Sequence, residues 1–132
     1  MMIDYKFYNA NPLGNIELDC VCRAISTATE LPYKSVEQKL ELIGDLFECD
    51  ALCVCCYQYL LDKVFGLKQK NANGKTVREI SKDFYNHKVI IRIDGHLTCS
   101  LYGIVYDIWD CTDEKADIFW IVYWQFVLVM IL

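Results

Sequence analysis

The strongest constraint on the fold is a run of three short β-type segments in the C-terminal half. The segments VIIRI, GHLTCSLYG and IVYDIWDC alternate in polarity and are rich in β-branched and aromatic side chains. Asp94 and Gly95 indicate a turn between the first two, and Gly103 indicates a hairpin between the second and third. Because turns this short join antiparallel neighbours, the sequence predicts a mostly antiparallel C-terminal sheet.

The N-terminal half predicts helices. A short strand over residues 3–8 is followed by the turn-rich stretch NANPLGN, and apolar residues then recur at helical spacing from Cys20 until Pro32 interrupts them. Ser35 and Gln38 fit a capping box at the start of a second helix that runs toward Cys49.

Two further helices are expected before the sheet begins. The segment 50–66 has Asp50 as a cap and Gly66 as a stop, and its nearly all-round apolar character predicts a buried helix whose cysteines fill the core. Thr76 is expected to cap a short amphipathic helix, VREISKDFY. Helices followed by an antiparallel sheet predict an α+β fold, and 132 residues suit a single domain spanning 1–132.

Charge and cysteine usage narrow the possible partners and compartment. Thirteen basic residues against 18 acidic ones give a net charge of −5 with no basic run, so nucleic acid is not an expected partner. The first residues lack the apolar stretch of a signal peptide, which predicts a cytoplasmic protein. The eight cysteines are therefore expected to be reduced thiols rather than disulfides.

The last fifteen residues, IFWIVYWQFVLVMIL, are almost entirely apolar. A membrane-spanning helix needs roughly 18 to 20 apolar residues, so this segment is too short and no membrane span is expected. We interpret it as a buried strand, with self-association through residues 118–132 and membrane contact as the alternatives.

Two histidines are available as a general base. His87 lies in a polar connection and is expected to be a solvated loop residue, whereas His96 begins a strand. A two-residue turn at Tyr102 and Gly103 would put Asp107 on the same face as His96, while an odd-numbered turn would put Asp110 there instead. The sequence leaves both acids open.

Cys20 is the candidate nucleophile. A cysteine in the first turn of a helix feels the positive end of the helix dipole, and a nearby imidazolium would lower its pKa further. Its backbone N–H could contribute to an oxyanion hole, with the side-chain amide of Asn15 or Asn11 as a second donor. Arg23 could pair with Asp19 or with Asp110 and lock the helix start against the sheet.

Two stretches together carry a family resemblance: NPLGNIELDCVCRAIS and GHLTCSLYGIVYDIWDC. The order of a cysteine opening a helix, a Gly-His strand and an acid on the next strand resembles the papain-like cysteine peptidases. More narrowly, the DCxxRA and GHLxxxxxGxxYDxWD patterns resemble a group of small uncharacterised phage and bacterial proteins related to those peptidases. The resemblance covers about residues 9 to 112.

The resemblance implies a papain-like fold, with N-terminal helices packed on the sheet, and a cysteine peptidase-like hydrolase. Cys20 would be the nucleophile, His96 the general base and Asp107 the acid that orients the imidazole. The substrate would be a peptide or isopeptide bond, in the host cytoplasm if a phage encodes the protein. Gly14 and Asn15 occupy the stretch where papain-like domains often carry a glutamine, so the oxyanion donor departs from the family pattern.

Two competing interpretations of these features remain. The cysteines in CVC (20–22) and CDALCVCC (49–56) could be combined into a zinc site, but only Cys53 and Cys56 have the two-residue gap typical of zinc pairs. We therefore expect no metal and no cofactor. The alternative function is a non-catalytic interaction protein of the same fold that binds a host protein through its acidic surface or its apolar tail.

Overall fold

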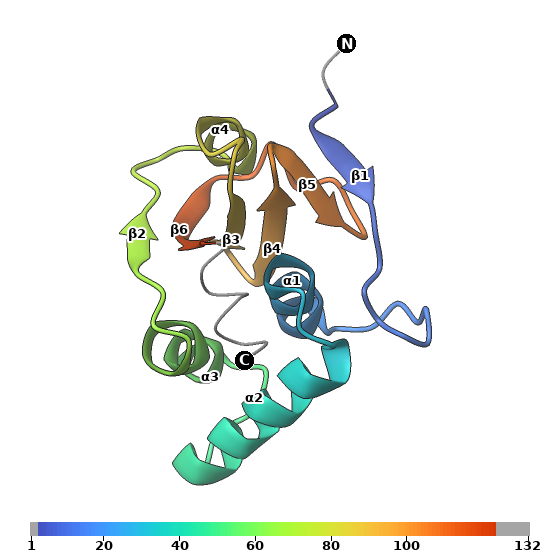
Figure 1. Ribbon diagram of the computed structural model, residues 1–132, viewed down its shortest axis with the longest axis vertical. Coiled ribbons are helices and arrows are strands. Elements are labelled where there is room, and N and C mark those ends of the chain that lie inside the picture. Colours follow the sequence, from blue (N-terminus) through green and yellow to red (C-terminus); the bar gives the residue numbers. More distant parts are fainter. Residues whose placement is uncertain (1–2, 124–132) are drawn as a thin grey trace.

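Six strands form one mixed sheet in the computed structural model, which describes residues 3–123 (Figure 1). The strands are β1 (Tyr5–Phe7), β2 (Gln69–Asn71), β3 (Lys88–Ile93), β4 (His96–Leu101), β5 (Ile104–Asp107) and β6 (Ala116–Val122). Their order across the sheet is β1-β5-β4-β3-β6-β2. Only β1 and β5 pair in parallel among these strands, so the predicted mostly antiparallel sheet is confirmed.

The hairpin between β4 and β5 has the two-residue turn that the sequence suggested. Tyr102 and Gly103 both have positive φ, 53° and 85°, as the tight turns that match strand twist require. The register pairs Cys99 with Tyr106 and Ser100 with Val105. Continued by one residue, this register aligns position 98 with position 107, which puts Asp107 and His96 on one face of the sheet.

The helices are α1 (Cys20–Thr29), α2 (Tyr33–Phe47), α3 (Val54–Tyr59), which continues into a π-helical turn over Leu60–Val64, and α4 (Val77–Asp83). The predicted capping box of α4 is present, with Thr76 and Glu79 bonded reciprocally. The predicted capping box at Ser35 is wrong: α2 begins directly after Pro32, and the Ser35 hydroxyl inside it accepts a hydrogen bond from Lys39. A proline is tolerated at a helix start because no backbone donor is needed there.

The helices cover both faces of the sheet (Figure 1). α1 and α3 pack on one face, where Ile90 and Trp120 are fully buried, and α2 packs against these two helices. α4 packs on the other face, against Ile91 and Phe119. Adjacent strand residues thus enter opposite cores, which gives the centre of the sheet an apolar layer on each side.

The third helical segment is not buried all round, contrary to the sequence-based expectation. Val54, Tyr59 and Val64 are exposed by 46, 39 and 49%. Its cysteines divide as well, because Cys56 is buried whereas Cys55 is exposed. The helix lies at the edge of the fold (Figure 1), so only its inner face finds a core to pack against.

The apolar C-terminal segment begins as strand β6, as predicted. β6 lies between β3 and β2 and pairs with both, and β2 covers its outer edge over residues 118–120. The remainder of the 118–132 segment proposed for self-association lies, from residue 124 onward, outside the described residues. Within residues 3–123, no helix has the length and apolar character needed to cross a bilayer.

Gly44 offers a test of how tightly the loop after α2 folds back on that helix. An added Cβ would lie 2.7 Å from the Cys49 carbonyl oxygen and 3.3 Å from the Ala51 Cα. Alanine normally favours a helix interior over glycine by about 0.5 to 1 kcal/mol, but here the backbone overlap outweighs that gain. We expect Gly44→Ala to lower the free energy of unfolding by about 1 to 3 kcal/mol in urea denaturation.

The matched control is Asp45→Ala, one residue along the same helix and exposed. It should change stability by less than about 0.5 kcal/mol. A stabilised Gly44→Ala protein would mean that the loop is not held against the helix in this way.

Candidate functional site

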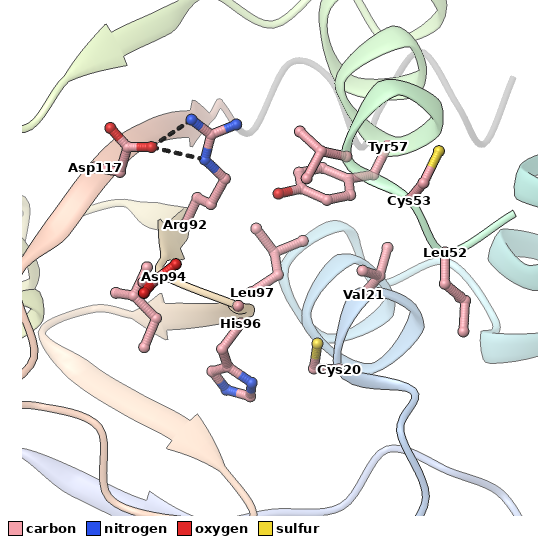
Figure 2. Close-up of a pocket in the computed structure, with 13 residues that line it drawn as sticks. Cys20, Val21, Leu52, Cys53, Tyr57, Arg92, Asp94, His96, Leu97 and Asp117 are labelled. Carbon is pink, nitrogen blue, oxygen red and sulfur yellow. Dashed lines mark hydrogen bonds and ion pairs between the residues drawn. The ribbon is translucent and has the colours of Figure 1, made fainter. Parts of the chain in front are cut away.

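A cleft of about 580 Å³ opens between the N-terminus of α1, the loop before α3 and the turn that joins β3 to β4 (Figure 2). It is lined by Cys20, Val21, Leu52, Cys53, Val54, Tyr57, Arg92, Ile93, Asp94, Gly95, His96, Leu97 and Asp117. Its size falls in the range of small-molecule and peptide side-chain sites.

Cys20 and His96 lie at the same end of this cleft (Figure 2). Cys20 is the first residue of α1 and is partly buried, and His96 is the first residue of β4. The two come together because α1 packs against the core face of the sheet beside β4, which brings the helix start next to the strand start. Both positions match the sequence-based hypothesis.

Asp107 contacts the His96 ring at its Nε2 atom. The Nε2 atom of His96 lies 2.6 Å from Oδ2 of Asp107, and Asp107 is only 4% exposed. The hairpin register therefore selects Asp107 over Asp110 as the acid beside this histidine. Asp110 is exposed, and its carboxylate instead accepts hydrogen bonds from the backbone and hydroxyl of Thr112.

Arg23 connects the helix start to the sheet, as expected, although one partner differs. Its Nε donates to Asp19 at 2.7 Å and its Nη1 donates to Asp107 at 3.1 Å. All three side chains are buried, so each carboxylate has a compensating charge in a region with little water. The predicted alternative partner Asp110 is not used, because the strand register turns Asp107 inward instead.

The charges of this network shift the titration of the two reactive groups. Burial opposes ionisation of the Cys20 thiol, but the neighbouring His96 outweighs it and lowers the thiol pKa. Burial likewise opposes the charged imidazole, yet Asp107 outweighs it and raises the His96 pKa to about 11. The pKa of Asp107 lies below its usual value because the His96 hydrogen bond overcomes the effect of burial. All three shifts favour an imidazolium flanked by a carboxylate and a thiolate.

The two asparagines considered for the oxyanion hole do not line the cleft. The Asn11 amide donates to Asp19 and Glu17, and the exposed Asn15 amide also donates to Glu17. Both amides are thus engaged with carboxylates in the loop before α1. The assignment of either one as an oxyanion donor is not supported by this geometry.

Sequence reasoning did not assign a role in the site to two side chains that contact it. The Trp109 ring lies against the His96 ring with centroids 5.1 Å apart, and Cys111 is fully buried with its sulfur 3.8 Å from Asp107 Oδ2. Trp109 shields one side of the imidazole from water. Trp109 lies in a bend after the end of β5, where the alternation of side chains along a strand no longer applies.

Within residues 3–123, two groups of side chains have the donor types and proximity that a metal ion needs. His96, Asp107 and Cys111 bring donors within 4.8 Å of one another, but His96 and Asp107 already share a hydrogen bond and Arg23 occupies the other Asp107 oxygen. That arrangement suits a hydrogen-bonded pair better than a metal ion. The second group, which we call the thiol cluster, consists of Cys49, Cys53, Cys55 and Cys56.

The chain matches no protein-family model, no curated protein and no solved structure. Interpretation of the cleft therefore depends on its own geometry and chemistry.

Replacing Arg23 tests how far the fold depends on the buried charges. Arg23→Met removes the cation shared by two buried carboxylates, so we expect a loss of about 3 to 5 kcal/mol in the free energy of unfolding at pH 7. Arg92→Met, which breaks the more exposed pair with Asp117, should cost only about 0 to 1 kcal/mol. Similar small losses for both variants, measured by urea denaturation, would contradict the central role of Arg23.

The raised His96 pKa predicts that the free energy of unfolding depends on pH. The measurement is made in Cys20→Ala protein, so that titration of the Cys20 thiol does not contribute. Below about pH 6.5 the imidazole is protonated in folded and unfolded chains alike, so its stabilising charge contributes fully. Above that pH the unfolded state loses the proton first, and the contribution falls as pH rises toward about 11. The stability difference between Cys20→Ala and Cys20→Ala/His96→Gln should shrink by more than about 1 kcal/mol from pH 6 to pH 9.5. A constant difference would mean that Asp107 does not hold the proton on His96.

Proposed function

We propose that the protein is a papain-like thiol hydrolase that cleaves a peptide or isopeptide bond, with Cys20 as nucleophile, His96 as acid and base, and Asp107 as the residue that orients His96. The observation that carries the proposal is the His96–Asp107 hydrogen bond of 2.6 Å behind an imidazole that shares the cleft with Cys20. A nucleophile, a base and an orienting group in this order are the minimal parts of such a site.

The reaction follows from the roles of the two imidazole nitrogens. Because Nε2 is engaged with Asp107, Nδ1 is the nitrogen left to exchange a proton with the cleft. The Cys20 thiolate attacks the substrate carbonyl carbon, the His96 imidazolium protonates the departing amine, and the C–N bond breaks to leave a thioester. Water then attacks the thioester carbonyl carbon while His96 accepts a proton from the water. The C–S bond breaks, which restores the Cys20 thiolate and releases the carboxylic acid product.

The carbonyl oxygen becomes negatively charged in both tetrahedral intermediates and needs a donor. The backbone N–H of Cys20 stands at the start of α1, where no preceding helical turn supplies an acceptor. This N–H is the donor we assign. The aliphatic and aromatic side chains of Val21, Leu97 and Tyr57 line the cleft beyond Cys20 and favour an apolar side chain next to the scissile bond.

Alkylation kinetics test the nucleophile without knowledge of the substrate. At pH 6 we expect iodoacetamide to modify Cys20 faster than an unstructured cysteine peptide, because a lowered thiol pKa raises the fraction present as thiolate. Mass spectrometry of tryptic peptides assigns the modified residue. His96→Gln should return the rate to that of the peptide.

The paired variants Asp107→Asn and Asp110→Asn separate the orienting acid from its neighbour. Asp107→Asn should slow Cys20 alkylation, whereas Asp110→Asn should leave it within about twofold, because of these two acids it is Asp107 that contacts the imidazole. Hydrolysis of a peptide-amide library that depends on both Cys20 and Asp107 would support the enzyme. A Cys20 that reacts no faster than the free peptide would overturn the proposal and favour the non-catalytic interaction protein.

A further inference from the structure

The thiol cluster forms where the chain leaves α2 and enters α3. Four sulfur–sulfur separations are short: Cys49–Cys56 2.9 Å, Cys53–Cys55 2.7 Å, Cys53–Cys56 3.6 Å and Cys49–Cys55 3.3 Å. All four sulfurs lie within 4.8 Å of one another, and all four cysteines carry free thiols. A single point is therefore within reach of every sulfur.

The loop backbone holds the thiols in place. The Cys49 N–H donates to the Gly44 carbonyl and the Cys53 N–H donates to the Asp50 carbonyl, while the Asp50 side chain accepts from the Leu52 N–H. The loop thereby reverses direction and sets Cys49 over the first turn of α3. The convergence is built into the turn rather than into the mutual attraction of thiols, which are only weak hydrogen-bond donors and acceptors.

We propose that the thiol cluster binds one zinc ion as a structural tetrathiolate site. A tetrahedral Zn–S length of about 2.3 Å requires sulfur–sulfur separations of about 3.8 Å. The four short separations would lengthen by about 1 Å or less, and the other two pairs already lie within 4.8 Å. An iron–sulfur cluster would need more widely spaced ligands, because several metal and sulfide atoms would have to fit between them. Four thiolates without an oxygen or imidazole ligand select a soft tetrahedral ion.

The role follows from the position of the cluster. Cys53 and its neighbour Leu52 line the cleft on the side opposite His96 (Figure 2), and Val54 is also a lining residue. The ion would fasten the end of α2 to the start of α3, and so fix this wall of the cleft. Two apolar side chains of this segment add little burial of their own, because Leu52 and Val54 are exposed by 42 and 46%. This inference does not depend on the proposed hydrolase, because metal binding needs no turnover.

Binding releases protons in a defined number. At a pH low enough for all four thiols to be protonated, Zn²⁺ displaces the proton of each one, which gives a site of net charge −2 and releases four protons to the solution. Zinc affinity should therefore fall steeply as pH is lowered. The released protons are measurable in weakly buffered solution at a pH where ordinary thiols are protonated.

The test uses the full-length protein, purified with reductant and then stripped of metal and reloaded with Zn²⁺ or Co²⁺. We expect one zinc per chain by elemental analysis, a higher Tm than the stripped protein, and, with Co²⁺, thiolate-to-cobalt charge-transfer absorption together with the strong visible bands of tetrahedral cobalt. The wild-type cobalt spectrum reports thiolate ligation even if a cysteine variant fails to fold.

Variants locate the ion. Loss of a residue that only hydrogen-bonds to a metal ligand typically weakens metal binding roughly 10- to 100-fold, so Cys55→Ser and Cys53→Ser, which each remove a ligand, should weaken zinc binding by more than this. The control is Cys22→Ala, which changes a buried cysteine outside the cluster and should retain one zinc per chain. Fully reduced wild-type protein that binds no zinc would overturn the proposal, as would disulfides within the cluster that form ahead of zinc. Iron or copper bound in preference to zinc would overturn the identity of the ion. If Cys111→Ser protein lost its zinc while Cys53→Ser protein kept it, the ion would belong to the group of His96, Asp107 and Cys111, and the proposal would be equally refuted.

Discussion

The buried carboxylate of Asp107 is the interaction on which the rest of the site depends. A carboxylate only 4% exposed is stable as an anion only if charged donors surround it. Arg23 supplies one such donor from α1 and His96 supplies the other from β4, while the backbone N–H of Ile108 donates as well. The same anion thereby ties the first helix to the sheet and holds the imidazole in one orientation.

This network explains why the reactive end of the cleft is well defined. Arg23 lies one turn after Cys20, so its two ion pairs hold the start of α1 while the thiol faces the imidazole. Beneath it, the central strands are apolar on both faces and packed between α1 to α3 on one side and α4 on the other. A strand fixed on both sides gives His96 a rigid base, which positioning of a general base requires.

The opposite wall of the cleft is built on a different principle. It consists of a short helix that buries Cys56 and Tyr57 on its inner face, and of a preceding loop in which Leu52 stays exposed, so hydrophobic burial holds the helix more than the loop. The thiol cluster lies in that wall. The protein thus places cysteines in two contrasting environments across one cleft: Cys20 beside a cation and a carboxylate, and the cluster among other thiols. The first environment favours a reactive thiolate, and the second favours shared coordination of a soft ion.

The sequence by itself determined the α+β class, the start of α1 at Cys20, the turns around β4 and the place of His96 at the start of a strand. These features are local, because turn residues, capping and hydrophobic periodicity act within a few neighbouring residues. Only the tertiary structure decided that Asp107 rather than Asp110 meets His96, that Arg23 bridges two acids, and that α4 covers the far face of the sheet. It also brought together the four cysteines of the thiol cluster, in which only Cys53 and Cys56 have the two-residue gap typical of zinc ligands. These tertiary features depend on strand register, on contacts between helices and strands, or on the path of a folded loop. The spacing of residues along the sequence does not encode any of the three.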